Sequence, residues 1–361
     1  MGKKINCVVS GTGAYLPERV VKNSEFINNE FYNSNGERIE KVGEEIISKF
    51  FEITEIEERR YIDDEYVTSD IGYFAAEDAL NSSNTDRETL DYIIVAHNFG
   101  DVKKENPKSD FVPSIAARIK AKLGIKNPFT VAYDLPFGCP GWLQAVIHAN
   151  YFIKSGDAKR IMVIGAETLS RVSDPHDIDS MLYSDGAGAT IFEGHENDTE
   201  QGIITHSVRS DAVQYSNLLS MGKSFKPGFR ETDIFLKMNG RKLYEYALNT
   251  VPQMVKDCVA KAGILAQDVK KILVHQANAK MNEAILTRLF KLFNISEIPK
   301  GIMPMTINKL GNNSVATIPI LFDMILKNKL NGHVLNQGDY IVLASVGAGM
   351  NVNVVVYRMP F

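Results

Sequence analysis

The stretch FTVAYDLPFGCPGWLQAVIHANYFIK, residues 129–154, joins a strand to a helix through a single cysteine. Residues 129–133 carry β-branched and aromatic side chains, which are typical of a strand. From Leu143 to Lys154 there are few charged positions until the end, which predicts a helix buried nearly all round. Cys139 lies between the two, and Pro140 suits the first helical turn because its φ is already helical. The sequence therefore predicts a buried strand–Cys–helix unit.

The same alternation extends in both directions along the chain. We expect buried strands at 5–13, 92–96, 161–165, 188–192, 203–208, 272–274, 340–344 and 352–357. We expect helices at 69–81, 114–123, 240–262, 279–293 and 315–327. Ser69 is expected to cap the first helix and Gly124 to end the second, and residues 25–66 should form short helices and loops. This order predicts an α/β protein with mostly parallel sheets, built as two similar halves at 1–199 and 200–361.

Composition narrows the class of protein. The 361 residues carry a net charge of −4, so no overall positive field indicates nucleic acid or an anionic membrane as partner. The three cysteines lie at no metal-ligand spacing and cannot all pair, which argues for a reducing compartment. Neither a signal peptide nor an apolar run of about 18 residues is visible. We expect a cytoplasmic enzyme without a membrane span.

Three polar residues are candidates for chemistry, each with an ordinary structural alternative. Cys139, at the start of a helix, would feel the positive end of the helix dipole, which stabilises thiolate; a free cysteine is also often only a small buried hydrophobe. His275 ends a strand, where ligands of open α/β sheets gather, although a lone histidine is more often structural. Asn312 follows Gly311 and equally suits a turn or a helix cap.

Two glycine-containing segments accompany them. Gly347-Ala348-Gly349 is either a plain hairpin or a place where backbone N–H groups meet an oxyanion. Asp185 is expected to order a turn and not to act in catalysis.

Taken in order, these segments resemble the β-ketoacyl-acyl carrier protein synthase III (KAS III) group of the thiolase superfamily along nearly the whole chain. The resemblance rests on residues 11–17, 133–135 leading into Cys139, 185–189, 238–241, 275–278 and 311–314. It implies a thiolase fold with two βαβαβαβ halves in a layered αβαβα core, normally a homodimer.

The resemblance also implies roles for the candidate residues. Cys139 would accept an acyl group from a thioester, with the backbone N–H groups of Cys139 and Ala348 as oxyanion hole. His275 and Asn312 would stabilise the enolate formed when a malonyl or β-ketoacyl-type thioester loses carbon dioxide, so that no metal or other cofactor is required. Substrate-binding positions would include Phe137, Asn278, Gly347 and Gly349.

The chain departs from KAS III enzymes that load acyl-coenzyme A. Those enzymes carry an early tryptophan and arginine for the adenine, whereas residues 48–54 have neither, and the only tryptophan is Trp142. Phe137 and Pro140 replace small residues beside the nucleophile. We expect a specialised synthase, of secondary metabolism for example, that takes its acyl donor from a carrier protein or uses an unusual chain. Docking of the acidic carrier is expected at Lys103, Lys104, Lys108, Lys120 and Lys122, where a solvated surface is an equal explanation.

Other functions share part of this pattern. The order Cys, His, Asn also occurs in papain-like proteases, but those carry their cysteine near a mature N-terminus and usually follow the secretory route. A hydrolase, or an acyltransferase that does not decarboxylate, on the same scaffold stays open.

Overall fold

The computed structural model describes residues 4–360, and two sheets form its framework. The first sheet has the order β1 (Lys4–Tyr15), β7 (Asp185–Asn197), β6 (Arg160–Thr168), β4 (Tyr92–His97) and β5 (Val131–Pro136). The second has the order β11 (Val269–Val274), β12 (Tyr340–Gly347), β13 (Asn351–Arg358) and β8 (Gly202–Ser210). Two small pairs join β2 (Arg19–Lys22) to β3 (Glu58–Tyr61) and β9 (Leu219–Gly222) to β10 (Phe235–Met238).

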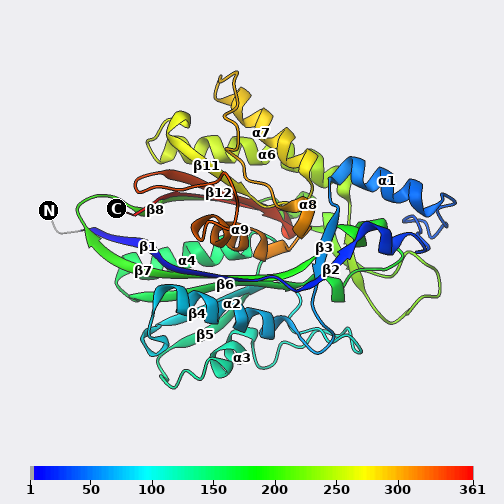
Figure 1. Cartoon of the computed structure of the whole chain (residues 1–361), viewed down its shortest axis with the longest axis horizontal. Coiled ribbons are helices and arrows are strands. Elements are labelled where there is room, and N and C mark those ends of the chain that lie inside the picture. The colour runs from blue at the N-terminus through cyan, green and yellow to red at the C-terminus, as the bar shows by residue number, and fades with distance from the viewer. Residues whose placement is uncertain (1–3, 361) are drawn as a thin grey trace.

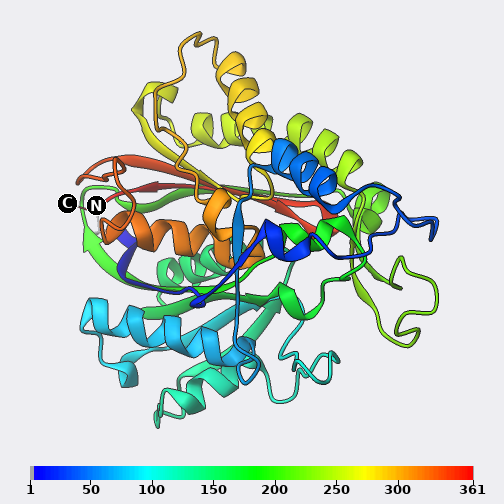
Figure 2. The same ribbon diagram turned by 45° about the vertical axis from the view of Figure 1, so that its right-hand side comes forward.

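Helices occupy three layers around these sheets (Figure 1). Between the sheets lie α4 (Gly141–Ser155) and α9 (Thr317–Leu326). The outer face of the first sheet carries α2 (Thr68–Ser83) and α3 (Ile115–Lys122), and the second sheet carries α6 (Gly240–Lys261), on which α7 (Ala279–Leu292) packs. Figure 2 shows the same helix–sheet–helix–sheet–helix order from a second direction. The shorter helices are α1 (Gly43–Thr54), α5 (Ala212–Tyr215) and α8 (Ile307–Leu310).

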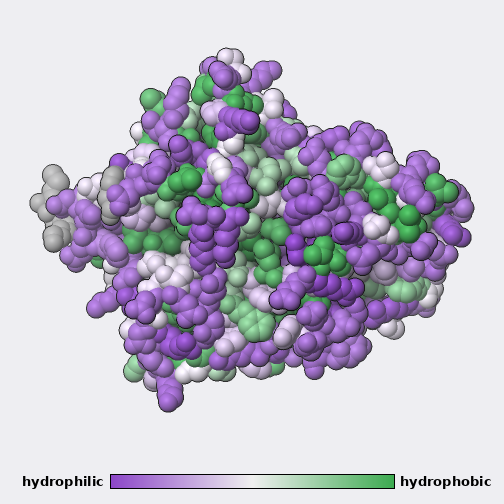
Figure 3. Space-filling model, viewed as in Figure 1, coloured by the Kyte–Doolittle hydropathy of each residue, from purple (hydrophilic) through white to green (hydrophobic). Residues whose placement is uncertain are grey.

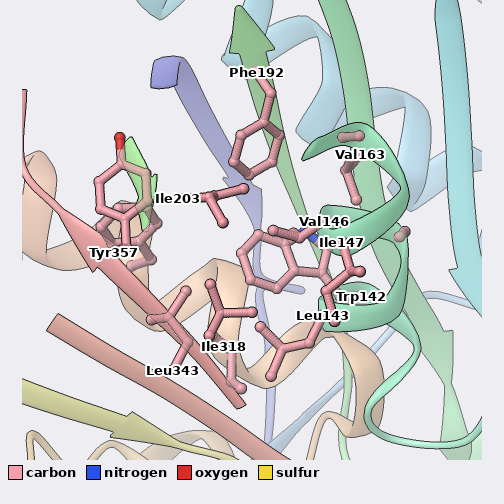
Figure 4. Packing of buried hydrophobic residues seen from close by; sticks show 14 of the residues in the cluster. Trp142, Leu143, Val146, Ile147, Val163, Phe192, Ile203, Ile318, Leu343 and Tyr357 are labelled. Carbon is pink, nitrogen blue, oxygen red and sulfur yellow. The ribbon is translucent and has the colours of Figure 1, made fainter. Parts of the chain in front are cut away.

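Helix α4 is buried because both sheets cover it. Trp142, Leu143, Val146 and Ile147 contact side chains from both sheets and from α9, among them Leu343 and Ile318 (Figure 4). Full burial of such an apolar side chain contributes about 1.5–3 kcal/mol. The predicted all-round burial of this helix is therefore confirmed, and it fixes the position of the cysteine just before it.

The prediction of mostly parallel sheets is wrong. The pairs β4–β5, β4–β6 and β11–β12 are parallel, but β1–β7, β6–β7, β12–β13 and β13–β8 are antiparallel. A parallel pair needs a long crossover connection. The three-residue turn at 348–350 between β12 and β13 is far too short for one.

Two local predictions also differ from the structure. Ser69 does not cap α2, because the helix begins at Thr68 and the Asp70 carboxylate accepts the Val67 N–H at 2.9 Å. The Ser69 N–H and hydroxyl instead donate to Asp101 at 2.7 and 2.8 Å. The strand expected at 129–133 is β5, which begins later and runs to Pro136.

The two sheets separate along the chain. The first sheet ends with β7 at Asn197 and the second begins with β8 at Gly202. We propose 1–199 and 200–361 as the two structural halves, interlocked by α9 of the second, which packs against β1 and β7 of the first. Within residues 4–360, no helix has the length and apolar character needed to cross a membrane.

Candidate active site

Cys139 follows β5 and stands immediately before the Pro140 that precedes α4. The Gly141 N–H donates to the Gly138 carbonyl at 2.9 Å, which closes a tight turn around the cysteine. Gly138 has φ +73°, and a Cβ there would lie 2.8 Å from the Ala348 nitrogen and 2.9 Å from its oxygen. Only glycine lets this turn approach the 347–349 loop so closely.

The 347–349 loop joins β12 to β13 and packs on the cysteine from the second half of the chain. A Cβ on Gly347 would lie 2.6 Å from the Cys139 nitrogen. The Asn351 side chain donates to the Ala348 carbonyl at 3.0 Å and fixes the turn. The backbone of Cys139 and that of Ala348 therefore lie side by side at one wall of a cavity.

Asn312 is held on both sides of its backbone by the segment before β7. Its N–H donates to the Leu182 carbonyl at 2.9 Å, and its carbonyl accepts from the Ser184 N–H at 3.0 Å. Its side-chain oxygen accepts the Ser314 N–H at 2.8 Å. This contact assigns the amide orientation and leaves the NH₂ group available to a ligand.

His275 follows β11, and its N–H donates to the Ala344 carbonyl at 2.9 Å. The side chain is buried, and burial lowers the pKa of His275 to about 4, against a smaller opposite effect of the adjacent Ser314 backbone. The imidazole is therefore neutral at pH 7 and can donate one N–H. It is absent from the walls of both cavities described below.

Asn278 both caps a helix and faces a cavity. Its side-chain oxygen accepts the Met281 N–H at 2.7 Å at the start of α7. Gln276 anchors the same turn, since it donates to the Pro304 carbonyl and accepts from the Thr306 N–H, both at 2.9 Å.

Two cavities meet at Asn312. The first, of about 410 Å³, contains Cys139 and is here named the acyl cavity. Its wall includes Phe137, Ala348, Gly349, Asn312, Ser314 and the apolar side chains Phe99, Leu169, Leu219, Met221 and Leu236. The second, of about 790 Å³, is here named the tunnel; its wall includes Asn278, Asn312, Asp179 and side chains of α1 and α6. Gly347 touches Cys139 but lines neither cavity.

The electrostatics of the cysteine differ from the prediction. Burial raises the pKa of Cys139 to about 11, which outweighs the lowering by a hydrogen bond from Ser314. The expectation of a thiolate favoured by the helix terminus therefore fails in the resting state, because the surrounding protein desolvates the charged form although Cys139 stays partly exposed to the acyl cavity. Cys139 rests as a thiol.

The structure adds residues near Cys139 that were not predicted. Ser314 donates to the Cys139 sulfur at 3.5 Å, and Asn98 contacts both Ser314 and Gly138. Glu167, fully buried, binds Asn98, and burial raises its pKa to about 7. A single acid at the end of the apolar run Ile161–Ala166 was the sequence signal for Glu167. Ser314 stood in the segment 311–314 without a role assigned to it, and Asn98 had no signal.

Other predicted features lie elsewhere. Trp142 is buried in the core, so it cannot stack on an adenine. Asp185 begins β7 and accepts from Ile62 and Ser170, in agreement with an ordering role. Three of the five lysines expected to dock a carrier already have partners: Lys104 pairs with Asp64, Lys122 with Asp70, and Lys120 donates to two carbonyls. All three cysteines are free.

Comparisons with known proteins match this arrangement. The family described as 3-Oxoacyl-[acyl-carrier-protein (ACP)] synthase III matches residues 133–212, and its C-terminal counterpart matches residues 259–359. The chain is 32% identical to a Beta-ketoacyl-[acyl-carrier-protein] synthase III of Cereibacter sphaeroides over 358 residues, which cover 98% of this chain and 99% of that protein. With the synthase III of Staphylococcus aureus it shares 31% identity over 347 residues, 96% of each chain.

Solved structures agree. The 3-oxoacyl-[acyl-carrier-protein] synthase III of Aquifex aeolicus superposes with a TM-score of 0.76 at 30% identity, covering 99% of this chain and 100% of that one. The priming β-ketosynthase of the R1128 polyketide pathway shares the fold, with a TM-score of 0.80 at 22% identity over 100% and 98% of the two chains. The layered architecture is the thiolase fold, as predicted, and its condensing enzymes are acyltransferases. This chain belongs to the β-ketoacyl-[acyl-carrier-protein] synthase III family.

Proposed function

We propose that the protein catalyses a decarboxylative Claisen condensation between an acyl thioester and a malonyl- or β-ketoacyl-type thioester, through an acyl group carried on Cys139. The observation that carries this proposal is the position of Asn312. It lies in the wall of the acyl cavity with Cys139 and also in the wall of the tunnel. An acyl group on the sulfur and a second thioester in the tunnel can therefore meet beside one amide.

In the first half-reaction the Cys139 sulfur attacks the donor carbonyl. The N–H groups of Cys139 and Ala348 receive the developing oxyanion, supported by the packing of Gly347 on the Cys139 nitrogen. The carbon–sulfur bond of the donor breaks, and the departing thiol takes the proton that the Cys139 thiol loses. The result is acyl-cysteine.

In the second half-reaction the extender thioester binds in the tunnel. The free NH₂ of Asn312 donates a hydrogen bond to its thioester carbonyl, and neutral His275 donates its one N–H there in exchange for its contact with the Ser314 backbone. As carbon dioxide leaves, the electron pair forms the enolate that these donors stabilise. Its carbon attacks the acyl-cysteine, and Cys139 departs and regains a proton.

The cavities indicate the substrate class. The acyl cavity of about 410 Å³ has apolar walls, and at roughly 30 Å³ per water-sized group it holds on the order of ten methylene-sized units. This size favours a medium-length acyl donor. Phe137 forms part of its wall beside the sulfur.

The tunnel is suited to the phosphopantetheine arm of a carrier protein. Lys41, Lys49 and Arg241 are exposed side chains in its wall, each paired with a neighbouring acid on its own segment, Glu45, Glu52 and Glu245. Exposed pairs of this kind contribute little stability, so a phosphate at the mouth can exchange for the acid. Exposed Val42, Phe51 and Ile53 of the α1 region lie nearby, and Figure 3 shows a hydrophobic patch among hydrophilic residues where α1 lies in Figure 1. We therefore propose this mouth, in place of the lysines of residues 103–122, as the carrier-binding surface.

Asp179 adds a polar contact inside the tunnel. Among the described residues none donates a hydrogen bond to its carboxylate. Burial, with the charge of Asp177, raises the pKa of Asp179 to about 7. We propose that the ionised carboxylate accepts an amide N–H of the arm.

We further propose that the protein is a homodimer paired through β5. This strand lies at the edge of the first sheet, so one row of its backbone N–H and C=O groups has no strand partner among residues 4–360. Phe129 is 84% exposed and Val131 48% exposed beside it. Light scattering should give a molar mass twice that of the chain. Val131→Asp should reduce it to the mass of a single chain.

Acyl transfer to Cys139 tests the catalytic proposal. The protein is incubated with acyl-carrier protein and acyl-coenzyme A donors of two to twelve carbons, and its intact mass is measured. An acyl adduct should form, be greatest for a medium chain on the carrier, vanish in Cys139→Ala and persist in the matched variant Cys258→Ala. No adduct from any thioester would refute the proposed function.

A further inference from the structure

The Cys139 sulfur has one side-chain hydrogen-bond donor among the described residues. The Ser314 hydroxyl lies 3.5 Å from it, within range for a bond to sulfur. Both residues line the acyl cavity, and Ser314 is otherwise buried. A hydroxyl so placed touches the reacting atom directly.

Asn98, which follows β4, occupies the acceptor side of the Ser314 hydroxyl. The Asn98 side-chain oxygen accepts the Gly138 N–H at 2.8 Å, which assigns the amide orientation. Its NH₂ group then donates to the Ser314 oxygen at 3.1 Å. Because the Ser314 oxygen is engaged as an acceptor, its proton is available to the two acceptors beside it, the Cys139 sulfur and the Glu167 carboxylate. When the sulfur becomes a thiolate during acyl transfer, it is the acceptor that gains most from this proton.

Glu167 fixes Asn98 in turn. Its carboxylate accepts from the Asn98 NH₂ at 2.5 Å and from the Asn98 N–H at 3.3 Å. Glu167, Asn98 and Gly138 come from the ends of β6, β4 and β5, three adjacent parallel strands. The network therefore rests on three adjacent strands of the first sheet and reaches across to Ser314 of the second half.

The backbone at Ser314 supports a role for its hydroxyl. Ser314 has φ +50°, a left-handed conformation that favours glycine. Such strain concentrates at functional sites, where the side chain contributes what glycine cannot. Backbone geometry alone would select glycine here.

We propose that Ser314 is a further catalytic residue, whose hydroxyl donates a hydrogen bond to the Cys139 sulfur and stabilises the thiolate during acyl transfer, with Asn98 and Glu167 as positioning residues. This inference rests on the proposed function for its catalytic meaning, although the thiolate contact can be measured without any thioester. The charged or titratable groups that face Cys139 are Glu167 of β6 and Tyr183, which precedes β7.

The experiment follows alkylation of Cys139 by iodoacetamide from pH 7 to 11 by intact mass, with the full chain. Cys7 and Cys258 are fully buried and should not react in the folded protein. A hydrogen bond to a charged group is worth about a factor of ten or more. Ser314→Ala should therefore slow alkylation about tenfold at each pH from 7 to 10, where the rate rises with the thiolate fraction.

Three further variants keep the test decisive. Ser314→Gly accepts the positive φ without strain and should show the same loss, which excludes a folding defect as the cause. Ser69→Ala removes another buried hydroxyl, bonded to Asp101, and should leave the profile unchanged. In an Asn98→Ala background the effect of Ser314→Ala should shrink, because the hydroxyl is no longer oriented.

An alkylation rate that is unchanged from pH 7 to 10 in both Ser314 variants would overturn this inference. Acyl transfer, measured in parallel, should lose kcat with little change in KM. If no thioester acylates Cys139 while the loss in alkylation rate is present, the proposed function fails and the thiolate contact stands.

Discussion

Glu167→Gln removes the one carboxyl group buried beneath the nucleophile turn. Glu167 is 0% exposed, and burial raises its pKa from 4.5 to about 7 against the lowering effect of its hydrogen bonds from Asn98. Between these two pH values the native protein holds a proton that the unfolded chain has released. Stability contributed by this proton is therefore fully present below pH 4.5 and is lost as the pH rises through 7.

The size of the effect follows from the width of that window. Each unit of pKa difference corresponds to about 1.4 kcal/mol, so the interval from 4.5 to about 7 gives on the order of 3 kcal/mol. Glutamine cannot ionise, and the variant lacks this term at every pH. The free energy of unfolding of the native protein minus that of Glu167→Gln should fall by about 3 kcal/mol between pH 4.5 and 7.5.

The measurement is urea denaturation of both proteins at one-unit pH steps. All other titrating groups are common to the two, so the difference isolates Glu167. The matched control is Glu196→Gln, which removes an exposed acid of β7 and should give a flat difference. A difference for Glu167→Gln that stays constant, or that rises with pH, would refute the assignment of Glu167 as a protonated buried acid.

Three further outcomes follow from the site. Gly347→Ala places a Cβ 2.6 Å from the Cys139 nitrogen and should slow acylation at least 100-fold. The control Gly222→Ala meets only the flexible Lys237 side chain and should acylate at the native rate. Equal rates for the two variants in an acylation time course would contradict the oxyanion assignment. His275→Ala should keep the rate of acylation within about tenfold of the native rate but release labelled carbon dioxide from a malonyl thioester at least 100-fold more slowly. An equal loss in both rates would argue against a role of His275 in decarboxylation. In the native protein, KM for a carrier thioester should fall about tenfold from pH 6 to 8 as Asp179 ionises, whereas KM of Asp179→Asn should not change over that range. The same pH dependence of KM in both proteins would exclude Asp179 as the contact.

Local patterns predicted much of the architecture. Apolar runs and helical caps identified the main strands and helices to within a few residues, because burial and backbone geometry act locally. Strand direction was the exception. The sequence alternation suggested crossovers throughout, but the 348–350 turn and the 3-10 segments between β6 and β7 replace a crossover helix.

The residues of the site also fall into those that the sequence predicted and those that only the structure identified. Motif order singled out Cys139, His275 and Asn312, and the structure brings Cys139 and Asn312 to one cavity, with His275 buried beside the Ser314 backbone. Asn98, Glu167 and Asp179 carried little or no sequence signal, since an asparagine or an acid near a strand or turn is usually solvated. Their environment is set by segments far apart in the chain, 40 to 216 residues for the contacts of Asn98, and only packing makes it visible.

The order of residues along the chain was enough to place Cys139 between a strand and a largely apolar helix, because the side chains that bury α4 are its own. The protonation state of that cysteine became visible only in the folded protein. Its pKa depends on desolvation by two sheets and on a hydroxyl 175 positions away. Desolvation and hydrogen bonding act through space, whereas the helix terminus that suggested a thiolate acts along the chain.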